Sequence, residues 1–575
     1  MLFNQPNTVN QPFAPLNVHP ALVRWMEHLG FNHADIEELK LWDLKKLPSF
    51  WELKDMAKVV DRIIQAVELN QPVAIFGDYD VDGTTSCALF YRFFQKINYP
   101  VKLYQPSRFV DGYGLHKTSI TKANEDGIKL LITVDCGTSS HEAADEALKV
   151  GIDLIITDHH KDAAPTMPNA LAIINPNRRD ETTSALQALA GVGVAFAVCV
   201  CVREKLLQKG ISVSSLYDLL PYVAVGTISD LAPLNSMNLI LCRHGMKQLM
   251  TMPHPAWKVF LAEKEYSPKY FESDLISFYI GPMINSKGRL EHPESALNLL
   301  TTDNFEHAAH YYQNLIFSNA ERRKIQLEIF EQAKSLVERE ILQQDTPIIV
   351  VYQPGWHEGV IGIVAAKLVE HFKRPAMVFT NSADKEFIKA SARTYRNIDL
   401  FSLLKSQEKF YEKFGGHKAA AGLTIHVKDF LDFKESITHY FNLLPLSDLA
   451  HTNEDPIIEI EFENIDDQLL DAIYQFAPFG QGNPMPKWRI KGAKLVSYNI
   501  LKNLHVKWNW TSTKPNDFFR RQYQGISFNY FSGQDILQPQ QLMLHSNPVT
   551  IDAWIKVNTF RNNNFLQLIV DRVHL

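Results

Sequence analysis

The sequence predicts an α/β protein in which a parallel-sheet domain, a long helix, a smaller α/β domain and a C-terminal β-barrel follow one another. From residue 71 onward, short and almost continuously apolar runs alternate with helical patterns, which is typical of a parallel sheet covered by helices on both faces. Residues 304–342 contain neither proline nor glycine and repeat their apolar side chains at helical spacings. After residue 453 the apolar runs are strand-like, which favours a small barrel.

Length and composition exclude several classes of protein. At roughly 150 residues per domain, a chain of 575 residues corresponds to about three or four domains. With 46% hydrophobic and 21% charged residues, the chain is not disordered, collagenous or a coiled coil alone. Its net charge of −6 gives no sign of a polyanion partner, so a nucleic-acid site has to be a local basic groove.

Cysteine usage and hydropathy predict a cytoplasmic protein. The five cysteines are odd in number and form no C-x-x-C pair, which argues against a disulfide framework and a zinc knuckle and fits a reducing compartment. The first ten residues show neither the basic nor the apolar segment of a secretory signal. Because no apolar run reaches the ~18 residues of a membrane span, we expect no membrane partner.

The parallel-sheet domain is expected at residues 71–300, after an N-terminal arm at residues 1–70. The arm carries a helical pattern at residues 57–68. The predicted strands of the domain are 72–76, 130–134, 153–157 and 171–174. Its predicted helices are 84–98, 141–150, 191–207 and 215–228.

A connector helix is expected at residues 301–345, where a single apolar face suits both a core helix and a link between domains. The second α/β domain, at residues 346–447, is expected to contain strands 347–352, 376–379 and 387–391 and helices 360–372 and 429–443. A linker near residues 444–453 precedes an OB-like barrel at residues 453–575, which we expect to bind nucleic acid. Its predicted strands are 457–462, 487–498, 504–510, 522–528, 550–557 and 565–570.

Acidic residues and histidines stand directly after the predicted strands of the first domain. In an open parallel sheet, ligands bind beyond the carboxyl ends of the strands, so side chains at successive strand ends meet in one crevice. A further acid follows an apolar helix. The residues concerned are Asp78, Asp80, Asp82, Asp135, Asp158 with His159 and His160, and Asp230.

This pattern predicts a site for divalent metal ions. Carboxylates gathered in one crevice repel one another and are costly to bury unless cations neutralise them. Oxygen ligands with one or two imidazoles suit Mg²⁺ or Mn²⁺, and two such ions about 4 Å apart are the usual arrangement for cleaving a phosphodiester. Taken singly, a D-x-D is more often a turn or cap and an acid at a strand end is more often a helix N-cap. Their combination at successive strand ends favours the metal site.

The same segments resemble the four motifs of the DHH phosphoesterase superfamily. The motifs are Asp78-x-Asp80-x-Asp82, Val134-Asp135-Cys-Gly137, Asp158-His-His160 and Gly226-Thr-Ile-Ser-Asp230. Further segments, at residues 106–115, 173–177, 189–195 and 281–290, resemble the RecJ exonucleases within it. Residues 356–362, 391–393 and 414–422 resemble the associated DHHA1 domain.

The resemblance extends from about residue 70 to the C-terminus and has two departures. Met283 stands where Arg or Lys is expected in Gly-Pro-Arg-x-Asn, which removes one potential phosphate contact. Cys136 replaces an Asn of some relatives. The resemblance implies processive 5′→3′ degradation of single-stranded DNA to mononucleotides in DNA repair and recombination, dependent on two Mn²⁺ or Mg²⁺ ions. It also implies a single-stranded-DNA-binding protein and a helicase as partners.

The resemblance further implies a role for each motif residue. One ion would be held by Asp78, Asp80 and Asp135. The other would be held by Asp82, Asp135, His159 and Asp230, with Asp135 as the bridging ligand. His160 would contact the scissile phosphate, and Asp158 would orient a histidine ring. No side chain is needed as a general base because water bound to the metal supplies the nucleophile.

Candidate DNA contacts combine guanidinium groups, ring side chains and glycines. Arginine matches phosphate in a bidentate manner, and adjacent glycines let backbone N–H groups approach a phosphate. An ion pair is an equally common role for a single surface arginine. The candidates are Arg108, Tyr113, Asn285, Arg289, Arg393, Gly415, Gly416 and His417.

Three other functions are compatible with parts of this pattern. Small phosphodiesterases of the superfamily act on short oligonucleotides or cyclic dinucleotides, but those chains are usually shorter and lack a C-terminal barrel. A non-catalytic RecJ-like DNA-binding scaffold would lack metal ligands, whereas none is missing here. DHHA1-like modules also occur in tRNA editing, but no zinc cluster of the synthetase type is visible in the sequence.

Overall fold

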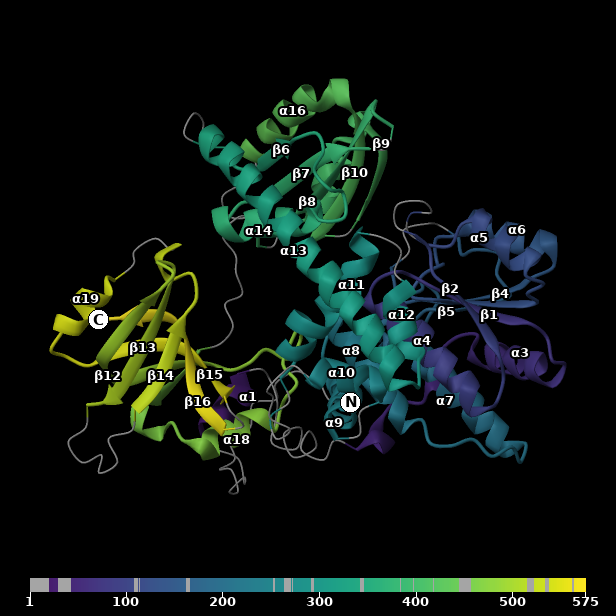
Figure 1. Ribbon diagram of the computed structural model, residues 1–575, viewed down its shortest axis with the longest axis horizontal. Coiled ribbons are helices and arrows are strands. Elements are labelled where there is room, and N and C mark those ends of the chain that lie inside the picture. Colours follow the sequence, from purple (N-terminus) through teal and green to yellow (C-terminus); the bar gives the residue numbers. More distant parts are fainter. Residues whose placement is uncertain are drawn as a thin grey trace. The chain divides into compact units, whose positions relative to one another are not determined.

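The computed structural model describes most of the chain (Figure 1). The described residues are 20–28, 43–107, 112, 114–161, 166–251, 254–262, 270, 272–290, 294–341, 346–382, 384–396, 398–416, 418–443, 457–513, 522–532, 537–560 and 563–575. The chain forms two compact units, one from residues 1–315 and 455–575 and the other from residues 316–454. The first unit contains two sheets and the second contains one.

A five-stranded parallel sheet organises the N-terminal part of the first unit, with the strand order β2-β1-β3-β4-β5. The strands are β1 (Val73–Gly77), β2 (Val101–Tyr104), β3 (Leu130–Val134), β4 (Asp153–Thr157) and β5 (Ala172–Ile174), and every pairing is parallel. β1 and β3 are buried along their whole length, as their uninterrupted apolar sequences require. The parallel-sheet fold predicted from the sequence is confirmed.

Helices cover both faces of this sheet (Figure 1). On one side lie α5 (Lys117–Glu125) and α6 (His141–Val150), whose Ile120 and Ala144 pack against Phe76 and Leu131 of the strands. On the other side lie α3 (Met56–Glu68), α4 (Val81–Lys96) and α7 (Gly191–Gln208). Because α7 is covered by neighbouring helices as well as by the sheet, its first nine residues are all buried.

A helical region follows the sheet. It contains α8 (Leu220–Ser229), α9 (Ser236–Thr251), α10 (Pro255–Ala262), the π-helical η5 (Ile276–Ile280), α11 (Gly281–Leu290) and α12 (Glu294–Thr301). The long helix α13 (Phe305–Ile341) then leads from the first unit into the second, within the range of the predicted connector. The elements β2, α5 and α9–α12 have no counterpart among the predicted elements.

The second unit is built on a mixed sheet with the strand order β6-β7-β8-β10-β9. Its strands are β6 (Ile349–Tyr352), β7 (Ala376–Asn381), β8 (Phe387–Arg393), β9 (Tyr411–Gly416) and β10 (Ala420–His426); only β6 and β7 pair in parallel. Helix α16 (Phe430–Asn442) packs on one face through Phe433, and α14 (Ile361–Phe372) packs on the other through Val364. The hairpin formed by β9 and β10 contains the Phe-Gly-Gly motif that the sequence singled out.

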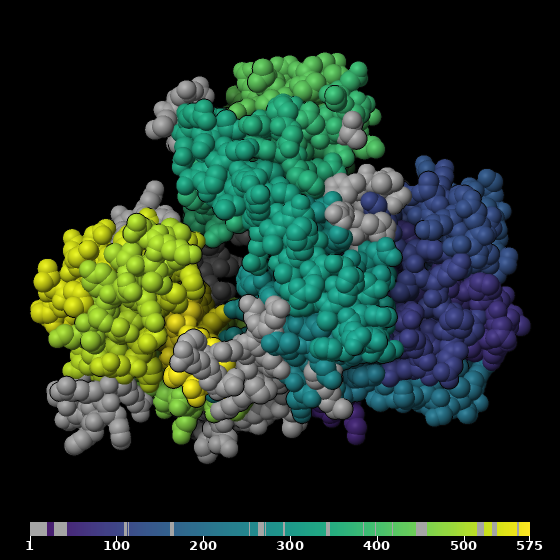
Figure 2. All heavy atoms as spheres, in the orientation of Figure 1, coloured from purple at the N-terminus to yellow at the C-terminus, as the bar shows by residue number. Residues whose placement is uncertain are grey.

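The C-terminal part of the first unit is a closed five-stranded barrel with one additional strand. β12 (Lys487–Leu501) pairs with both β13 (His505–Ser512) and β15 (Val549–Phe560), so the order β12-β13-β14-β16-β15 returns to β12. β14 (Gln522–Ser527) and β16 (Asn563–His574) complete the barrel, and β11 (Ile457–Glu461) adds to β12 in parallel. In the space-filling view these strands form one continuous body, coloured light green to yellow (Figure 2). The predicted barrel is confirmed.

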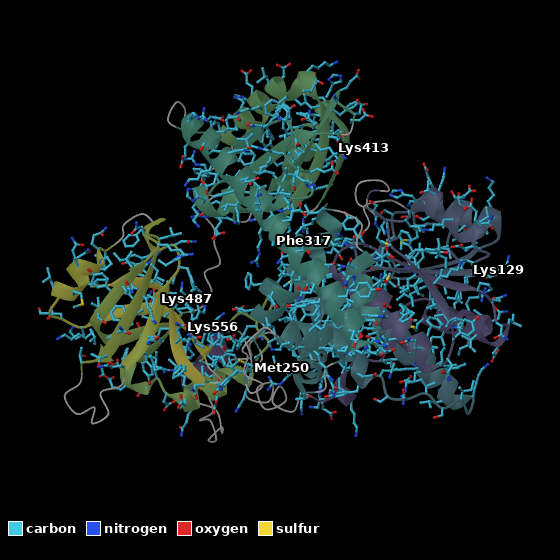
Figure 3. All side chains as sticks on the ribbon, in the orientation of Figure 1. Lys129, Met250, Phe317, Lys413, Lys487 and Lys556 are labelled. Carbon is cyan, nitrogen blue, oxygen red and sulfur yellow. The ribbon has the colours of Figure 1, made fainter. Side chains whose placement is uncertain are left out.

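Alternation along the barrel strands separates core from surface. Trp488 and Ile555 are fully buried inside, whereas the neighbouring Lys487 and Lys556 extend outward (Figure 3). The barrel core also includes a segment from far upstream, because Leu22 of α1 (Pro20–His28) belongs to the same cluster of buried residues. Residues of the predicted N-terminal arm are therefore divided: α1 packs on the barrel and α3 packs beside the first sheet.

All five cysteines are free and buried. In the part of the chain that the structure describes, no helix combines the length and the apolar character that crossing a membrane requires.

Candidate metal centre

The topology of the first sheet places the candidate ligands in one crevice. In the order β2-β1-β3-β4-β5 the chain turns from one edge of the sheet to the other between β1 and β3, and ligands bind beyond the carboxyl ends of the strands at such a switch point. Asp78 directly follows β1, Asp135 follows β3 and Asp158 follows β4. Asp230 joins them from the C-terminal end of α8.

The structure brings the predicted metal ligands into three overlapping groups. Within each group the oxygen or nitrogen atoms lie within 4.8 Å of one another. The groups are Asp78 with Asp80 and Asp135; Asp82 with His159 and Asp230; and Asp135 with His159 and His160. Nε2 of His159 lies 3.2 Å from Oδ1 of Asp135 and 3.7 Å from an oxygen each of Asp82 and Asp230. Asp135 is thus common to two groups.

Local backbone conformation explains how these carboxylates converge. Asp80 caps the N-terminus of α4, with its Oδ1 accepting a hydrogen bond from the Gly83 N–H at 3.0 Å. Asp135 has a left-handed backbone with φ 58°, a conformation that aspartate tolerates better than most residues. A Cβ atom on Gly191 would lie 2.7 Å from the Cβ of Asp135, so only glycine leaves room for this carboxylate.

Asp82 is held by the N-terminus of α7. Its Oδ2 accepts a hydrogen bond from the Gly191 N–H at 2.7 Å, and its Oδ1 accepts one from the Val192 N–H at 2.8 Å. Amide groups at a helix N-terminus stabilise a negative charge. A Cβ atom on Gly226 would lie 2.9 Å from the Asp82 Oδ1, so α8 can approach this carboxylate closely only with glycine at that position.

Asp158 contacts the histidine ring beside the centre. It is 2% exposed, and its Oδ1 is hydrogen-bonded to Nδ1 of His160 at 2.8 Å. Its Oδ2 accepts a hydrogen bond from the Thr138 N–H, and Oδ1 also accepts one from the His159 N–H. The carboxylate therefore fixes both the Asp-His-His turn and the orientation of the His160 ring.

The electrostatics are those of crowded and buried carboxylates. Burial, followed by the charges of Asp230 and Asp80, raises the pKa of Asp82 well above its usual value. Burial and the charge of Asp82 do the same to the pKa of Asp135. Burial and the charge of Asp80 raise the pKa of Asp230 to about 7. Each of these carboxylates is thus penalised in its charged form unless a cation is present.

The two residues of the Asp158–His160 pair shift in opposite directions. Burial lowers the pKa of His160, but the hydrogen bond to Asp158 and its charge outweigh burial and raise that pKa to about 9. Burial raises the pKa of Asp158, but the hydrogen bond and charge of His160 outweigh it and lower that pKa below the usual range.

The donor set fits divalent metal ions. Oδ1 of Asp135 is buried and accepts no hydrogen bond from the described residues, although a buried carboxylate oxygen normally has a partner. It faces Nε2 of His159, a second candidate ligand atom, at 3.2 Å. Hard oxygen ligands supplemented by one or two imidazoles suit Mg²⁺ and Mn²⁺. A cation would neutralise this Asp135 oxygen and offset the repulsion among the carboxylates.

The candidate DNA contacts are distributed over both units. In the first unit, Asn285 and Arg289 are half-buried and four residues apart on α11, so they share one face of the helix. Met283 of the same helix is 5% exposed and packs into the domain. Arg108 and Tyr113 lie outside the described residues.

In the second unit, Arg393 ends β8 and its guanidinium donates hydrogen bonds to the Ser391 hydroxyl and the Ala392 carbonyl. Gly415 and Gly416 end β9, where Gly416 has φ 148° and no room for a Cβ atom beside β10. His417 lies outside the described residues.

Several residues that support the centre have no role that the sequence analysis assigned. The Asn175 side chain donates hydrogen bonds to the His160 carbonyl and the Thr138 hydroxyl, and the Asn177 side chain donates one to the His159 carbonyl. Both asparagines fall in the Ile-Ile-Asn-Pro-Asn segment, which resembles the RecJ exonucleases. The sequence feature that could have identified these supporting residues is the pair of closely spaced asparagines after a predicted strand.

Comparison with known protein families divides the chain into three parts. Residues 72–227 match the DHH family N-terminal domain, residues 345–443 match the DHHA1 domain, and residues 458–572 match the RecJ OB domain. The first match contains Asp78, Asp135 and the Asp-His-His motif, and it ends just before Asp230.

Two curated relatives match the chain along most of its length. The single-stranded-DNA-specific exonuclease RecJ of Escherichia coli (strain K12) is 30% identical, and the match covers 97% of this chain and 96% of that protein. The protein of the same name from Bacillus subtilis (strain 168) is 32% identical over 94% of this chain. The chain spans 66% of the length of the Bacillus protein.

The similar solved structures include two RecJ proteins with bound manganese. RecJ of Thermus thermophilus in complex with Mn²⁺ has a TM-score of 0.75 at 24% identity, covering 97% of this chain and 76% of that one, which shows the shared fold. An exonuclease RecJ bound to manganese has a TM-score of 0.57 at 28% identity, covering 68% of this chain and 96% of that one. Since the Escherichia coli relative matches from end to end, the chain belongs to the family of RecJ single-stranded-DNA-specific exonucleases.

Proposed function

We propose that this chain is a metal-dependent exonuclease that degrades single-stranded DNA in the 5′→3′ direction to mononucleotides, in DNA repair and recombination. One observation carries the proposal: buried aspartates and His159 converge at the switch point of a parallel sheet, in a chain whose full-length relatives are named single-stranded-DNA-specific exonucleases. The direction and the mononucleotide product rest on the resemblance of the motifs.

Two divalent ions, Mn²⁺ or Mg²⁺, are assigned to the centre. Asp78, Asp80 and Asp135 would hold one ion, and His159 and Asp135 would share the other with two further carboxylates. The manganese in the RecJ structures compared above supports this assignment. Bound ions supply Lewis acidity toward the phosphodiester and toward the attacking water.

The side chains around the centre orient the ligands and the substrate. The α7 amides fix both oxygens of Asp82, so this carboxylate is pre-oriented before an ion arrives. Nδ1 of His160 is hydrogen-bonded to Asp158, so Nε2 lies on the opposite side of the ring from that carboxylate. We propose that Nε2 contacts the scissile phosphate. Asp135, His159, His160 and Asp158 are therefore the proposed catalytic group.

Phosphate contacts are proposed on both units. The guanidinium of Arg393 is fixed by Ser391 and Ala392, and a pre-oriented guanidinium binds a phosphate with little loss of rotamer entropy. Asn285 and Arg289 present a donor face from α11. Arg108, Tyr113, Gly415, Gly416 and His417 remain assigned to the same role.

Digestion of single-stranded DNA labelled separately at each end tests this function. With a 5′ label, we expect labelled mononucleotide from the first time point. With a 3′ label, we expect the label to be released only at the end of each strand and, because the degradation is expected to be processive, few labelled fragments of intermediate length. The reverse pattern would overturn the direction but not the activity. Turnover confined to dinucleotides or cyclic dinucleotides would instead favour the small-phosphodiesterase class, and no turnover with Mn²⁺ would favour a scaffold.

We infer the cellular context from the same family. Single-stranded DNA is the proposed substrate, and a single-stranded-DNA-binding protein and a helicase are the proposed protein partners. The free thiols of all five buried cysteines support a cytoplasmic location. Co-purification of a helicase with the tagged protein, before and after nuclease treatment, would test the partner assignment independently of DNA bridging.

A further inference from the structure

A turn of the C-terminal barrel contacts the segment that carries Asp230. The Leu234 N–H donates a hydrogen bond to the Gln481 carbonyl at 2.7 Å, which joins the loop after α8 to the turn at residues 480–483. A Cβ atom on Gly480 would lie 2.9 Å from the Leu234 side chain, and one on Gly482 would lie 3.4 Å from the Leu234 nitrogen. Both contacts lie within the first unit. The turn therefore packs on the loop at close range.

The turn is itself rigid. Gly480 and Asn483 exchange two backbone hydrogen bonds, at 2.9 and 3.1 Å. The side chain of Asn483 is buried, and its amide donates hydrogen bonds to the carbonyls of Phe476 and Pro478 at 2.9 Å each. Because two backbone hydrogen bonds close the turn and a buried side chain anchors it, its backbone is held in one conformation against the neighbouring loop.

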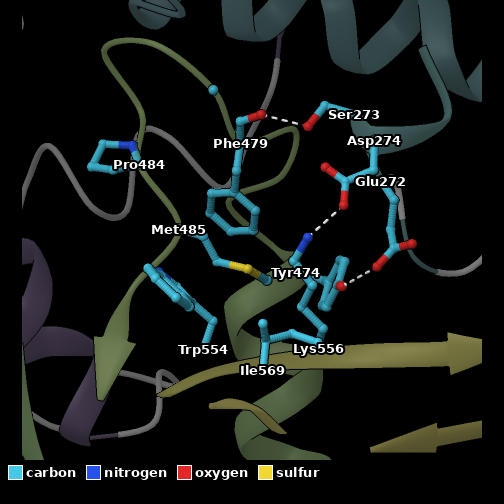
Figure 4. Close-up of a pocket in the computed structure, with 11 residues that line it drawn as sticks. Glu272, Ser273, Asp274, Tyr474, Phe479, Pro484, Met485, Trp554, Lys556 and Ile569 are labelled. Carbon is cyan, nitrogen blue, oxygen red and sulfur yellow. Dashed lines mark hydrogen bonds and ion pairs between the residues drawn. The ribbon is translucent and has the colours of Figure 1, made fainter. Parts of the chain in front are cut away.

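Two residues of the catalytic domain, Arg243 and Ser273, also donate hydrogen bonds to the segment just before this turn. Arg243 of α9 donates hydrogen bonds to the carbonyls of Tyr474, Gln475 and Ala477. These carbonyls stand at the C-terminal end of α18 (Asp467–Tyr474), where the helix dipole favours a cation. The Ser273 hydroxyl donates a hydrogen bond to the Phe479 carbonyl (Figure 4).

The loop on the catalytic side needs external support. It begins at Asp230 and continues through Leu231, which has a left-handed backbone with φ 58° and a side chain that is 63% exposed. A left-handed backbone is strained for leucine and persists only where its surroundings fix it. The turn contact at Leu234 is one such constraint.

Asn238 connects this loop to the other ligand-bearing segment. Its side chain is 1% exposed and donates hydrogen bonds to the Pro233 carbonyl at 2.8 Å and the Ala188 carbonyl at 2.7 Å. Pro233 lies in the loop after Asp230. Ala188 stands three residues before Gly191, whose N–H group holds Asp82. The buried Asn238 amide thus links the loop after Asp230 to the segment before Gly191. These two segments position the carboxylates of Asp230 and Asp82.

We propose that the OB-type barrel helps to position the metal centre, through the turn at residues 480–483, the loop after Asp230 and the buried Asn238. In addition to the DNA binding expected of the barrel, its turn then maintains the ligand geometry at Asp230, and Asn238 extends that constraint toward Asp82. This proposal rests on the metal assignment made under the proposed function. Asn238, Gly480 and Gly482 act as positioning residues and touch neither the substrate nor the ions.

A matched pair of glycine variants tests the turn. Gly482 has φ 79° and faces the loop, and Gly492 of β12 has φ 78° but its nearest neighbours are Thr513, Glu461 and Glu463 of the barrel. Because φ is positive and nearly the same at both positions, valine strains the backbone at each of them. We expect Gly482→Val to weaken Mn²⁺ binding about tenfold, the usual size of an effect transmitted through a supporting residue, and Gly492→Val to leave it unchanged.

Mn²⁺ affinity is measured by calorimetry and by the electron paramagnetic resonance of free Mn²⁺, with DNA absent. A loss of affinity in Gly482→Val alone supports the proposal, and an affinity within about twofold of wild type in a folded Gly482→Val overturns it. An equal loss in both variants would mean general destabilisation of the barrel and would also overturn it. Because no DNA is present, failure of this proposal is distinguishable from failure of the nuclease assignment.

A second pair of variants tests Asn238 and a neighbouring contact between the barrel and the catalytic domain. Asn238→Leu removes both buried hydrogen bonds at similar volume, and we expect weaker Mn²⁺ binding and a lower kcat on a trinucleotide. Lys556→Gln breaks an ion pair with Asp274 that also joins the barrel to the catalytic domain, at a cavity of about 350 Å³ (Figure 4). It should leave both quantities unchanged. Reduced Mn²⁺ affinity in Lys556→Gln would show that the loss of any contact between the barrel and the catalytic domain weakens metal binding. That result would overturn the specific role of the turn.

Discussion

At the scale of single residues, the metal centre is defined by what each carboxylate already contacts. Asp82 and Asp158 each have both oxygens hydrogen-bonded, to the α7 amides in one case and to the Asp-His-His turn and Thr138 in the other. Asp135 has a buried oxygen that accepts no hydrogen bond from the residues described. Hydrogen bonds therefore orient Asp82 and Asp158, whereas Asp135 keeps an oxygen available to a cation. Burial nevertheless raises the pKa of both Asp82 and Asp135, so both carboxylates are penalised in their charged form without a cation.

Asp135→Asn should abolish hydrolysis without unfolding the protein. The substitution removes the ligand common to two groups, and it also removes one of several buried like charges. We therefore expect the melting temperature of the metal-free protein to stay level or rise, while the stabilisation by Mn²⁺ is lost. Differential scanning calorimetry with and without Mn²⁺ measures this. The exposed Asp145→Asn on α6 serves as a control, and a turnover above about a tenth of wild type in Asp135→Asn would contradict the two-ion assignment.

Asp158→Asn should separate ring orientation from metal binding. The amide can still accept hydrogen bonds from the backbone through its oxygen, but it no longer pairs with a charged His160 ring. We expect kcat to fall about 10–100-fold while bound Mn²⁺ is retained, as for other residues that orient a catalytic ring. Metal content determined by mass spectrometry of the purified variant checks this. Loss of Mn²⁺ would place Asp158 or His160 among the ligands instead.

At the scale of elements, the ends of strands and the starts of helices carry the chemistry. β1 and β3 deliver Asp78 and Asp135, and the N-terminus of α7 supplies the amides for Asp82. In the second unit the hairpin of β9 and β10 carries two glycines with different surroundings. A Cβ atom on Gly416 would collide with the Ala420 carbonyl at 2.5 Å, whereas one on Gly415 would meet no described atom within 4 Å.

This difference makes Gly415 a clean probe of DNA contact. Gly415→Ala should leave the melting temperature close to wild type because the added methyl group enters open space. If a phosphate approaches the backbone there, the methyl group should raise KM for single-stranded DNA with little change in kcat. Gly416→Ala serves as the structural comparison and should lower the melting temperature. An unchanged KM in a folded Gly415→Ala would remove Gly415 from the proposed interface.

At the scale of the whole molecule, the barrel has two proposed tasks that a truncation cannot separate. Deleting residues from about 455 onward would remove any DNA contacts of the barrel together with the turn at residues 480–483. It would also expose Leu22 and Trp25 of α1, which share the barrel core. Point variants in an otherwise intact chain are therefore the informative experiments.

Salt dependence and strand choice test the binding mode of the intact enzyme. The net charge of −6 means that DNA binding depends on local cations rather than on the overall field. Affinity for single-stranded DNA should fall linearly with salt on a logarithmic plot, with a slope of about −0.7 per phosphate contact. Blunt duplex should remain uncut at enzyme levels that degrade a single strand. Fluorescence anisotropy and gel assays measure the two quantities; efficient cleavage of blunt duplex would reject the single-strand assignment.

The amino-acid sequence was sufficient to predict the fold class and the residues that gather at the centre. Continuous apolar runs specify buried parallel strands whatever packs on them, and the acids after β1, β3 and β4 converge because the carboxyl ends of parallel strands share one edge. The long helix α13 and the strands of the barrel were likewise readable from periodicity, because each depends on local spacing of apolar residues.

The contacts that support the centre were not predictable from the sequence, because they join distant parts of the chain. The roles of Gly191, Asn238 and the turn at residues 480–483 depend on backbone groups brought together from distant parts of the chain. Because almost every residue type carries a backbone N–H group, such a hydrogen bond cannot be recognised from the sequence. The placement of α1 on the barrel was equally hidden, since its apolar face fits any core. Periodicity reports that a side chain is buried, but the partner that buries it is fixed only when distant segments pack together.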